Sequence, residues 1–466
     1  MGSLSALSRR KSIEQLQQEA GESRQFRRVL GLWQLTAIGL GGIIGVGIFV
    51  LTGVVAATQT GPAVLISFVL AGVASAAAAL CYAEFAGMIP VAGSAYTYGY
   101  AVLGEFAAWL LGWDLLLCYA LIVAVVAAGW SGYVQALLGA AGFSLPLWAQ
   151  GAAGSGAGHM FDVVAAAVSL AIALLLTVRT EWGARFNSAI VAVKIAGVLL
   201  VILAGVAYVN PDHWHPFMPF GFNGVLAGAA VVFFAVFGYD TLTTAAEEAK
   251  DPQRDLPWAV VLSLGIAMIL YLGMSVVLTG IVPSSTLNNA APVANAFAAI
   301  GLRWVMVAVS VAAITGITSV LFANMLAGAR IGFALSRDGL IPAWFSAVHP
   351  RYHTPHRATL ILGVVTAAAA GSFPLTVVAQ VVNFGMLAAF AVICVAVIVL
   401  RRARPELKRS FRVPFVPLVP VVGAVFSLWL IWGLPVGVWL GFAAWMVAGL
   451  LVYRGYGLRH SRLAQD

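Results

Sequence analysis

Two glycine-containing stretches, far apart along the chain, carry residue types that can bind a small polar ligand. The first, residues 39–47, has five glycines in nine residues, a poor composition for a helix interior. If a helix unwinds there, the free N–H groups and positive dipole at the start of its second half suit a carboxylate. Gly41 and Gly45 also have the spacing of close helix packing. The glycines alone leave both interpretations open.

The second stretch, residues 233–248, interrupts an apolar run with Gly238-Tyr239-Asp240. A polar break at membrane depth is costly unless it lines a cavity. Paired interrupted helices in two halves of a membrane protein are the best sequence pointer to a transporter's binding site. The two stretches together therefore favour a ligand site between two broken helices.

Lys194 is the third candidate for chemistry. It lies within the apolar run 186–208, where an unpaired ammonium is costly. A lysine that gains and loses a proton there could couple transport to the proton gradient. The alternative is a side chain that extends to the membrane surface.

Composition sets the surroundings of these residues. The chain has 466 residues, of which 62% are hydrophobic and only 9% are charged, whereas soluble domains carry roughly 25% charged residues. This excludes a cytosolic enzyme, a nucleic-acid-binding protein and a disordered chain, and leaves a polytopic helical membrane protein. The charged segment 1–30 is expected to be a cytoplasmic amphipathic segment and not a signal peptide.

Apolar runs predict twelve membrane spans, and the positive charges support that number. With the N-terminus inside, every lysine and arginine except Arg303 and Lys194 falls in a segment on the cytoplasmic side or in a cytoplasmic tail, as the positive-inside rule requires. The expected spans are 33–57, 62–88, 104–137, 162–178, 186–208, 223–248, 257–282, 304–335, 357–374, 378–400, 415–433 and 435–453.

Several motifs, in this order and spacing, resemble the amino acid–polyamine–organocation permeases. The likeness covers roughly residues 28–455 and is greatest to bacterial, proton-coupled members of the cationic amino acid transporter family. The motifs are the stretches 41–49, 82–85, 90–96, 233–240, 247–254, 336–340 and 411–417.

This resemblance implies an all-α polytopic membrane protein with twelve transmembrane helices and the leucine-transporter fold, a 5+5 inverted repeat plus two C-terminal helices. The expected division is 1–30 for the N-terminal segment, 31–210 and 211–402 for the two repeats, 403–455 for the last two spans and 456–466 for the cytoplasmic tail. The expected location is the plasma (inner) membrane.

The resemblance also implies roles for individual residues. It places the ligand's carboxylate on N–H groups of the first break, its ammonium on carbonyls of the second, and Phe234 above the ligand as an outer gate. It places the Lys194 ammonium where sodium-driven relatives of the fold hold a cation. The implied binding residues are Ile43, Gly45, Val46, Gly47, Cys118, Phe234, Ala235, Phe237 and Asn324.

Charged residues at the inner end of the sixth expected span are candidates for a second gate. Glu247 and Glu248 lie near Arg254, and we expect Arg337 to lie near them. Such an ion-pair network could break when the inner end opens. The alternative is static anchoring of loops at the membrane surface.

Substrate choice depends on the charge around the site. Neither Cys118 nor Asn324 supplies a carboxylate, so a cationic side chain would lack compensation. We therefore expect a proton-coupled symporter of neutral, small to medium L-amino acids. One alternative is a cationic amino acid transporter, because Asp114 is one turn from Cys118. The others are an exchanger and a channel.

The expected partners are the amino acid, protons and the lipid bilayer, with a small membrane protein as an open possibility. The apolar runs contain no histidine and no paired carboxylates at ligand spacing. We therefore expect no enzyme activity, cofactor or metal, and no nucleic-acid partner.

Overall fold

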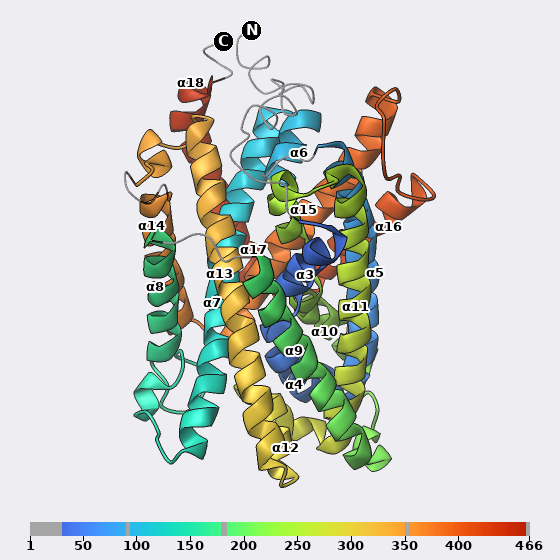
Figure 1. Cartoon of the computed structure of the whole chain (residues 1–466), viewed down its shortest axis with the longest axis vertical. Coiled ribbons are helices and arrows are strands. Elements are labelled where there is room, and N and C mark those ends of the chain that lie inside the picture. The colour runs from blue at the N-terminus through green and yellow to red at the C-terminus, as the bar shows by residue number, and fades with distance from the viewer. Residues whose placement is uncertain (1–29, 90–93, 179–183, 350–351, 353, 463–466) are drawn as a thin grey trace.

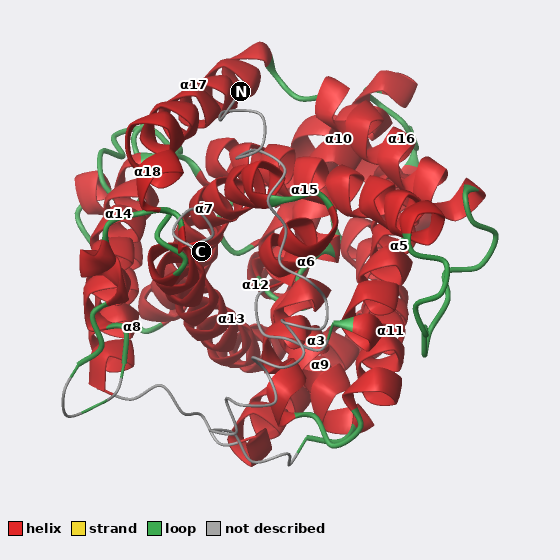
Figure 2. Ribbon diagram, turned by 90° about the horizontal axis from the view of Figure 1, so that it is seen from above, coloured by secondary structure: helices red, strands yellow, loops and turns green. Residues whose placement is uncertain are grey.

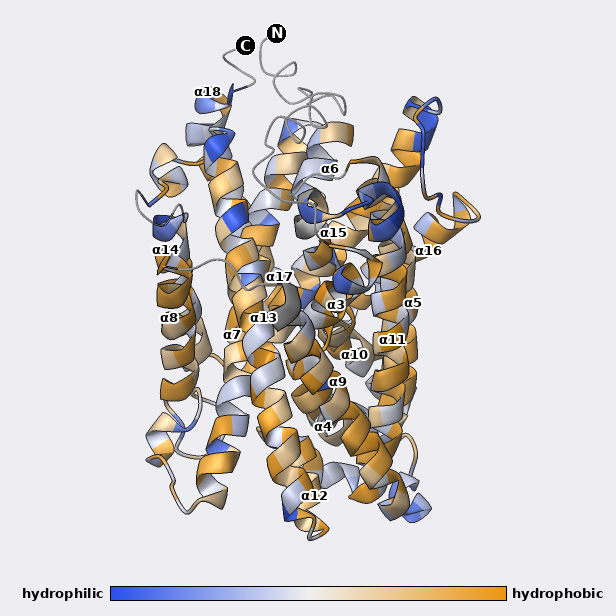
Figure 3. Cartoon of the chain, in the orientation of Figure 1, coloured by the Kyte–Doolittle hydropathy of each residue, from blue (hydrophilic) through white to orange (hydrophobic). Residues whose placement is uncertain are grey.

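The computed structural model describes residues 30–89, 94–178, 184–349, 352 and 354–462, and within these ranges every regular element is a helix. Long helices run roughly along one direction (Figure 1). Their middle parts are predominantly apolar, and hydrophilic residues gather toward the ends (Figure 3). This is the pattern that a bilayer imposes, since only helices satisfy their backbone groups inside hydrocarbon.

Helices occupy all the expected spans, in the expected order. Those of the first half are α3 (Leu32–Ile43), α4 (Thr52–Val55), α5 (Val64–Met88), α7 (Glu105–Ala140), α8 (Val163–Val178) and α9 (Ala184–Gly205). Those of the second half are α10 (Gly221–Val236), α11 (Pro252–Ile281), α13 (Arg303–Arg337), α14 (His356–Ser372), α15 (Leu375–Ala403), α16 (Leu418–Trp432) and α17 (Val436–Val452). Shorter helices outside the expected spans are α6 (Ser94–Val102), α12 (Pro292–Ala299) and α18 (Leu458–His460).

Eight helical runs in the described ranges are long and apolar enough to cross a membrane, fewer than the twelve spans that the sequence predicted. One reason is that the run Gly47–Met88 joins the second half of the first expected span to the whole of the next. A second reason is that α3, α8 and α16 are apolar but short, and that α14, with 17 residues, is short as well.

The two breaks lie inside the bundle, because residues 43–49 and 231–242 are all buried. Seen along the helices, α3 and α6 are near the middle, and α8, α14, α16 and α17 are at the periphery (Figure 2). The core is one continuous cluster of buried apolar side chains. The backbone at the two breaks is therefore shielded by packed helices, as irregular backbone at membrane depth must be.

Candidate functional site

The first break separates α3 from a second half-helix. The helix α3 ends at Ile43, the backbone of Ile44 is extended (φ −78°, ψ 101°), and helical structure resumes at Val46. The first N–H groups of any helix lack partners within it. The second half-helix therefore presents free donors at Gly45, Val46 and Gly47.

The second break separates α10 from a 3-10 helix, η7 (Tyr239–Glu248). Phe237 is extended (φ −102°, ψ 179°), and Gly238 has φ +116°. A side chain at position 238 would be strained, because L-residues rarely adopt this conformation. Glycine is therefore what allows the chain to turn here while Phe234 and Phe237 stay on the same side, with ring centroids 5.3 Å apart.

The two breaks touch each other through glycines. A Cβ atom on Gly42 would lie 2.5 Å from the carbonyl oxygen of Gly238, and one on Gly238 would lie 2.6 Å from that of Gly42. Further along, a Cβ atom on Gly47 would lie 2.5 Å from the Cβ atom of Ala235. Small residues thus let the two backbones approach closely.

A cavity lies between the two breaks. Its volume is about 20 Å³, which holds about one water molecule, so a larger ligand must displace side chains such as Phe234. Seven of the residues expected from the sequence line it: Ile43, Gly45, Val46, Gly47, Phe234, Phe237 and Asn324. The other lining residues were not predicted as binding residues: Gly42, Tyr119, Ile122, Val126, Gly238, Asp240 and Val320.

Two expected binding residues do not line this cavity. Ala235 packs behind Gly47. The Cys118 thiol faces α15, donating to Asp114 Oδ1 at 3.4 Å and lying 3.8 Å from the Val382 carbonyl oxygen. The next residue, Tyr119, faces the cavity with Ile122 and Val126. Their 3-4 spacing marks one helix face, a signal available in the sequence.

Lys194, on α9, contacts the first break and is not among the residues that line the cavity. Its side chain is fully buried. The ammonium donates to the carbonyl oxygens of Gly41 (2.7 Å) and Ile44 (3.0 Å) and to Ser319 Oγ on α13 (3.2 Å). All three acceptors are neutral oxygens, a set that also suits a metal cation.

Comparison with known proteins identifies the family. The model of a family described as amino acid permease matches residues 30–454. The chain belongs to the amino acid permease family.

Two bacterial relatives match this permease over nearly the whole of both chains. A methylthioribose transporter of Bacillus subtilis is 47% identical over 99% of this chain and all of its own. The branched-chain amino acid permease BcaP of the same organism is 42% identical over 98% of this chain and 99% of its own. A vacuolar cationic amino acid transporter 4 of Arabidopsis thaliana is 37% identical over 86% of this chain and 68% of its own. The permease is accordingly an amino acid transporter of the membrane.

One hydrogen bond in the permease joins two cavity-lining residues. The Tyr119 hydroxyl donates to Asp240 Oδ2 at 2.8 Å, and both side chains are buried. Asp240 follows the second break directly, so this bond fixes the start of η7 against α7. Without the Tyr119 hydroxyl, the Asp240 carboxyl group would lack this donor in a site largely shielded from water.

We predict that Tyr119→Phe lowers the transport efficiency, kcat/KM, about tenfold, because leaving a buried polar group without its partner costs about 1–3 kcal/mol. Initial uptake rates over a range of substrate concentrations measure this. The matched control is Tyr133→Phe on the same helix, whose hydroxyl donates to the Phe49 carbonyl oxygen at 2.7 Å, outside the cavity. Equal losses in both variants would contradict a specific role for Tyr119.

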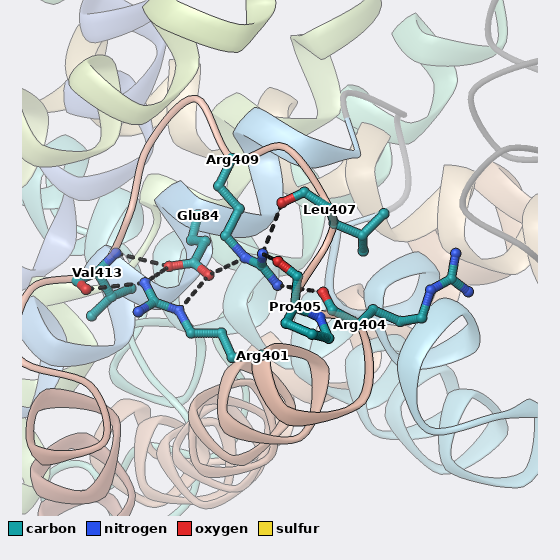
Figure 4. A network of polar contacts seen from close by, with 7 residues as sticks. All are labelled: Glu84, Arg401, Arg404, Pro405, Leu407, Arg409 and Val413. Carbon is teal, nitrogen blue, oxygen red and sulfur yellow. Dashed lines mark hydrogen bonds and ion pairs between the residues drawn. The ribbon is translucent and has the colours of Figure 1, made fainter.

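The residues expected to form an inner gate differ in how far they are exposed. Arg254 and Arg337 are exposed, and Glu248 is half-buried. The Glu247 side chain lies outside the described residues. A different ion-pair network stands at this end of the molecule, between Glu84, Arg401 at the end of α15 and Arg409 in the α15–α16 connection (Figure 4).

Among the described residues, no group of three or more histidine, cysteine, aspartate or glutamate side chains is arranged to hold a metal ion. The groups that line the cavity include backbone N–H and carbonyl groups, apolar side chains and the polar side chains of Tyr119, Asp240 and Asn324.

Proposed function

We propose that this permease is a proton-coupled symporter of neutral, small to medium L-amino acids that works by alternating access. The observation that carries the proposal is the cavity between the two breaks. It combines free N–H donors at Gly45 and Val46 with carbonyl oxygens at the end of α10, which are complementary to an α-carboxylate and an α-ammonium. Phe234 is then the outer gate, which must move to admit the ligand.

The side-chain end of the cavity favours a neutral ligand. Ile122, Val126 and Val320 are apolar, and Asn324 is uncharged. The one carboxyl group, Asp240, already accepts the Tyr119 hydroxyl. A buried cationic side chain needs a carboxylate of its own, so cationic substrates are the second candidate.

Lys194 is the proposed coupling group. Its ammonium holds two carbonyl oxygens of the first break, so gain or loss of its proton would change how those carbonyls are held. The adjacent N–H groups bind the substrate in this proposal. Proton binding and substrate binding would then favour the same arrangement of the break, which is what coupling requires.

The proposed architecture is the twelve-span leucine-transporter fold, with repeats at 31–210 and 211–402 and spans 11 and 12 at 403–455. Two interrupted helices, five spans apart and in contact at Gly42 and Gly238, support it. The distribution of basic residues supports a plasma-membrane protein with both termini in the cytoplasm.

Competition in proteoliposomes tests the substrate class. We expect uptake of labelled L-alanine from an acidic exterior to be blocked by excess L-valine and not by L-arginine. Block by arginine would move the specificity to the cationic class. Methylthioribose lacks the carboxylate and ammonium that the breaks are proposed to bind. If it alone blocks uptake, the site binds the substrate named for the Bacillus subtilis transporter, and the proposal of an amino acid substrate is wrong.

A further inference from the structure

The carboxylate of Glu84, near the end of α5, is buried and is contacted by the end of α15 and by the loop that joins α15 to α16. Its side chain is 1% exposed, although α5 ends only four residues later. Arg401, at the end of α15, donates from Nε to Oε1 at 3.0 Å and from Nη2 to Oε2. The backbone N–H of Val413 donates to Oε2 at 2.8 Å (Figure 4).

A second arginine closes the network from the same loop. Arg409 Nε lies 3.2 Å from Glu84 Oε1 as an ion pair. The guanidinium also donates to the carbonyl oxygens of Leu407 (2.8 Å), Arg404 (3.1 Å) and Pro405 (3.3 Å). Arg409 therefore holds the loop in shape, whereas Arg401, with two parallel donors, makes the stronger contact with Glu84.

The loop bridges two helices that belong to different parts of the bundle. On one side, α5 is bonded to the second break, because Ser75 donates to the Val236 carbonyl and Tyr239 donates to the Ser75 carbonyl, at 2.7 and 3.2 Å. On the other side, α15 packs along α7. The Glu84 network thus ties α5, which is bonded to the second break, to α15, which packs against α7.

A separate contact attaches α15 to α10, away from the Glu84 network. Asn383, in the first third of α15, donates to the carbonyl oxygens of Ala230 (2.7 Å) and Val231 (3.0 Å) on α10. If only the Glu84 network breaks, α15 remains attached there. The free end of α15, at Arg401, can then move away from α5.

We propose that the α15–α16 connection is a latch, defined by Glu84, Arg401, Arg409 and Val413, that closes the cytoplasmic end of the α5–α15 interface. Opening it separates α5 from α15 and exposes the path from the cavity toward the cytoplasm. This inference rests on the proposed alternating-access function, but its structural part can be tested without any substrate.

Two native cysteines report on this interface. Cys81 is one turn before Glu84 on α5, and Cys394 lies two turns before Arg401 on α15. Both thiols are fully buried, and the two side chains lie close to each other. A maleimide reagent can reach them only if the two helices separate.

The test compares Glu84→Gln with wild type in detergent, without substrate, and locates the label by peptide mass spectrometry. We expect Cys81 and Cys394 to react at least about tenfold faster in the variant, because removing one charge of a buried pair leaves the other uncompensated. Arg401→Lys should give a smaller increase, since lysine cannot bind the carboxylate with two parallel donors.

The matched control is Glu406→Gln. It removes the Arg404–Glu406 ion pair of the same loop, whose side chains are 48% and 60% exposed, so it should leave labelling unchanged. Cys118, buried on α7, reports general unfolding, because all three cysteines react equally only in a variant that has lost its fold. If Glu84→Gln behaves in this way, labelling of Cys81 and Cys394 in Arg401→Lys tests the latch instead.

Unchanged labelling of Cys81 and Cys394 in both Glu84→Gln and Arg401→Lys would overturn the latch. That result would leave the proposed transport function untouched. If the wild type shows no proton-driven uptake while Cys81 and Cys394 label faster in Glu84→Gln, the latch is supported and the proposed transport function is wrong.

Discussion

Lys194→Met is expected to abolish accumulation of L-alanine driven by a pH gradient. With a difference of about two pH units, one proton per substrate supports roughly 100-fold accumulation, at about 1.4 kcal/mol per unit. Without the ammonium, the carbonyl oxygens of Gly41 and Ile44 lose the donor that they share with Ser319. The variant should therefore reach no more than equal concentrations inside and outside, whether or not a protonophore is present.

The measurement is the final concentration ratio of labelled alanine in proteoliposomes. Methionine approximates the length of the lysine side chain and is apolar, so the change removes mainly the charge. The control is Lys250→Met, which changes an exposed lysine outside the spans. If the Lys194 variant still concentrates alanine, the coupling role assigned to Lys194 is wrong.

Gly42→Ala is expected to lower the transport rate about 100-fold or more. The new methyl group would meet the Gly238 carbonyl at 2.5 Å and the Thr241 hydroxyl at 2.6 Å. Backbone cannot yield as a flexible side chain does, so the two breaks must move apart, and overpacking of this kind costs about 1–3 kcal/mol of stability. The N–H donors and the carbonyl acceptors would no longer face one ligand.

Gly41→Ala is the matched control for this prediction. A Cβ there meets only one side-chain atom, Val191 Cγ2, at 3.4 Å, so we expect nearly normal uptake. Gel filtration and thermal unfolding of both purified variants separate a distorted site from an unfolded protein. Normal uptake by Gly42→Ala would show that the contact between the breaks is not needed.

Most of the fold follows from local sequence. Apolar runs located the long helices because this signal is contained within one segment. The glycines of residues 39–47 and the Gly238-Tyr239-Asp240 stretch identified both breaks, because unfavourable helix composition is a local property. The short helices α6 and α12 were not predicted, because helices of 9 and 8 residues between the expected spans leave no long apolar run in the sequence.

The finer parts of the site depend on long-range packing. Cys118 and Tyr119 are neighbours in sequence, and only the packing of α7 against α15 decides which of them faces the cavity. The contact of Glu84 with Arg401 joins residues 317 positions apart. Each residue alone is consistent with an ordinary charge at the membrane surface, so spacing could not reveal the pair.

Proton movement caused by the substrate tests the central claim most directly. Proteoliposomes with a pH-sensitive dye inside, and no initial gradient, would receive L-alanine on the outside. The account predicts that alanine acidifies the lumen in the wild type and not in Lys194→Met. Alanine entry without a pH change, or entry only when alanine is already present inside, would contradict proton symport and favour an exchanger.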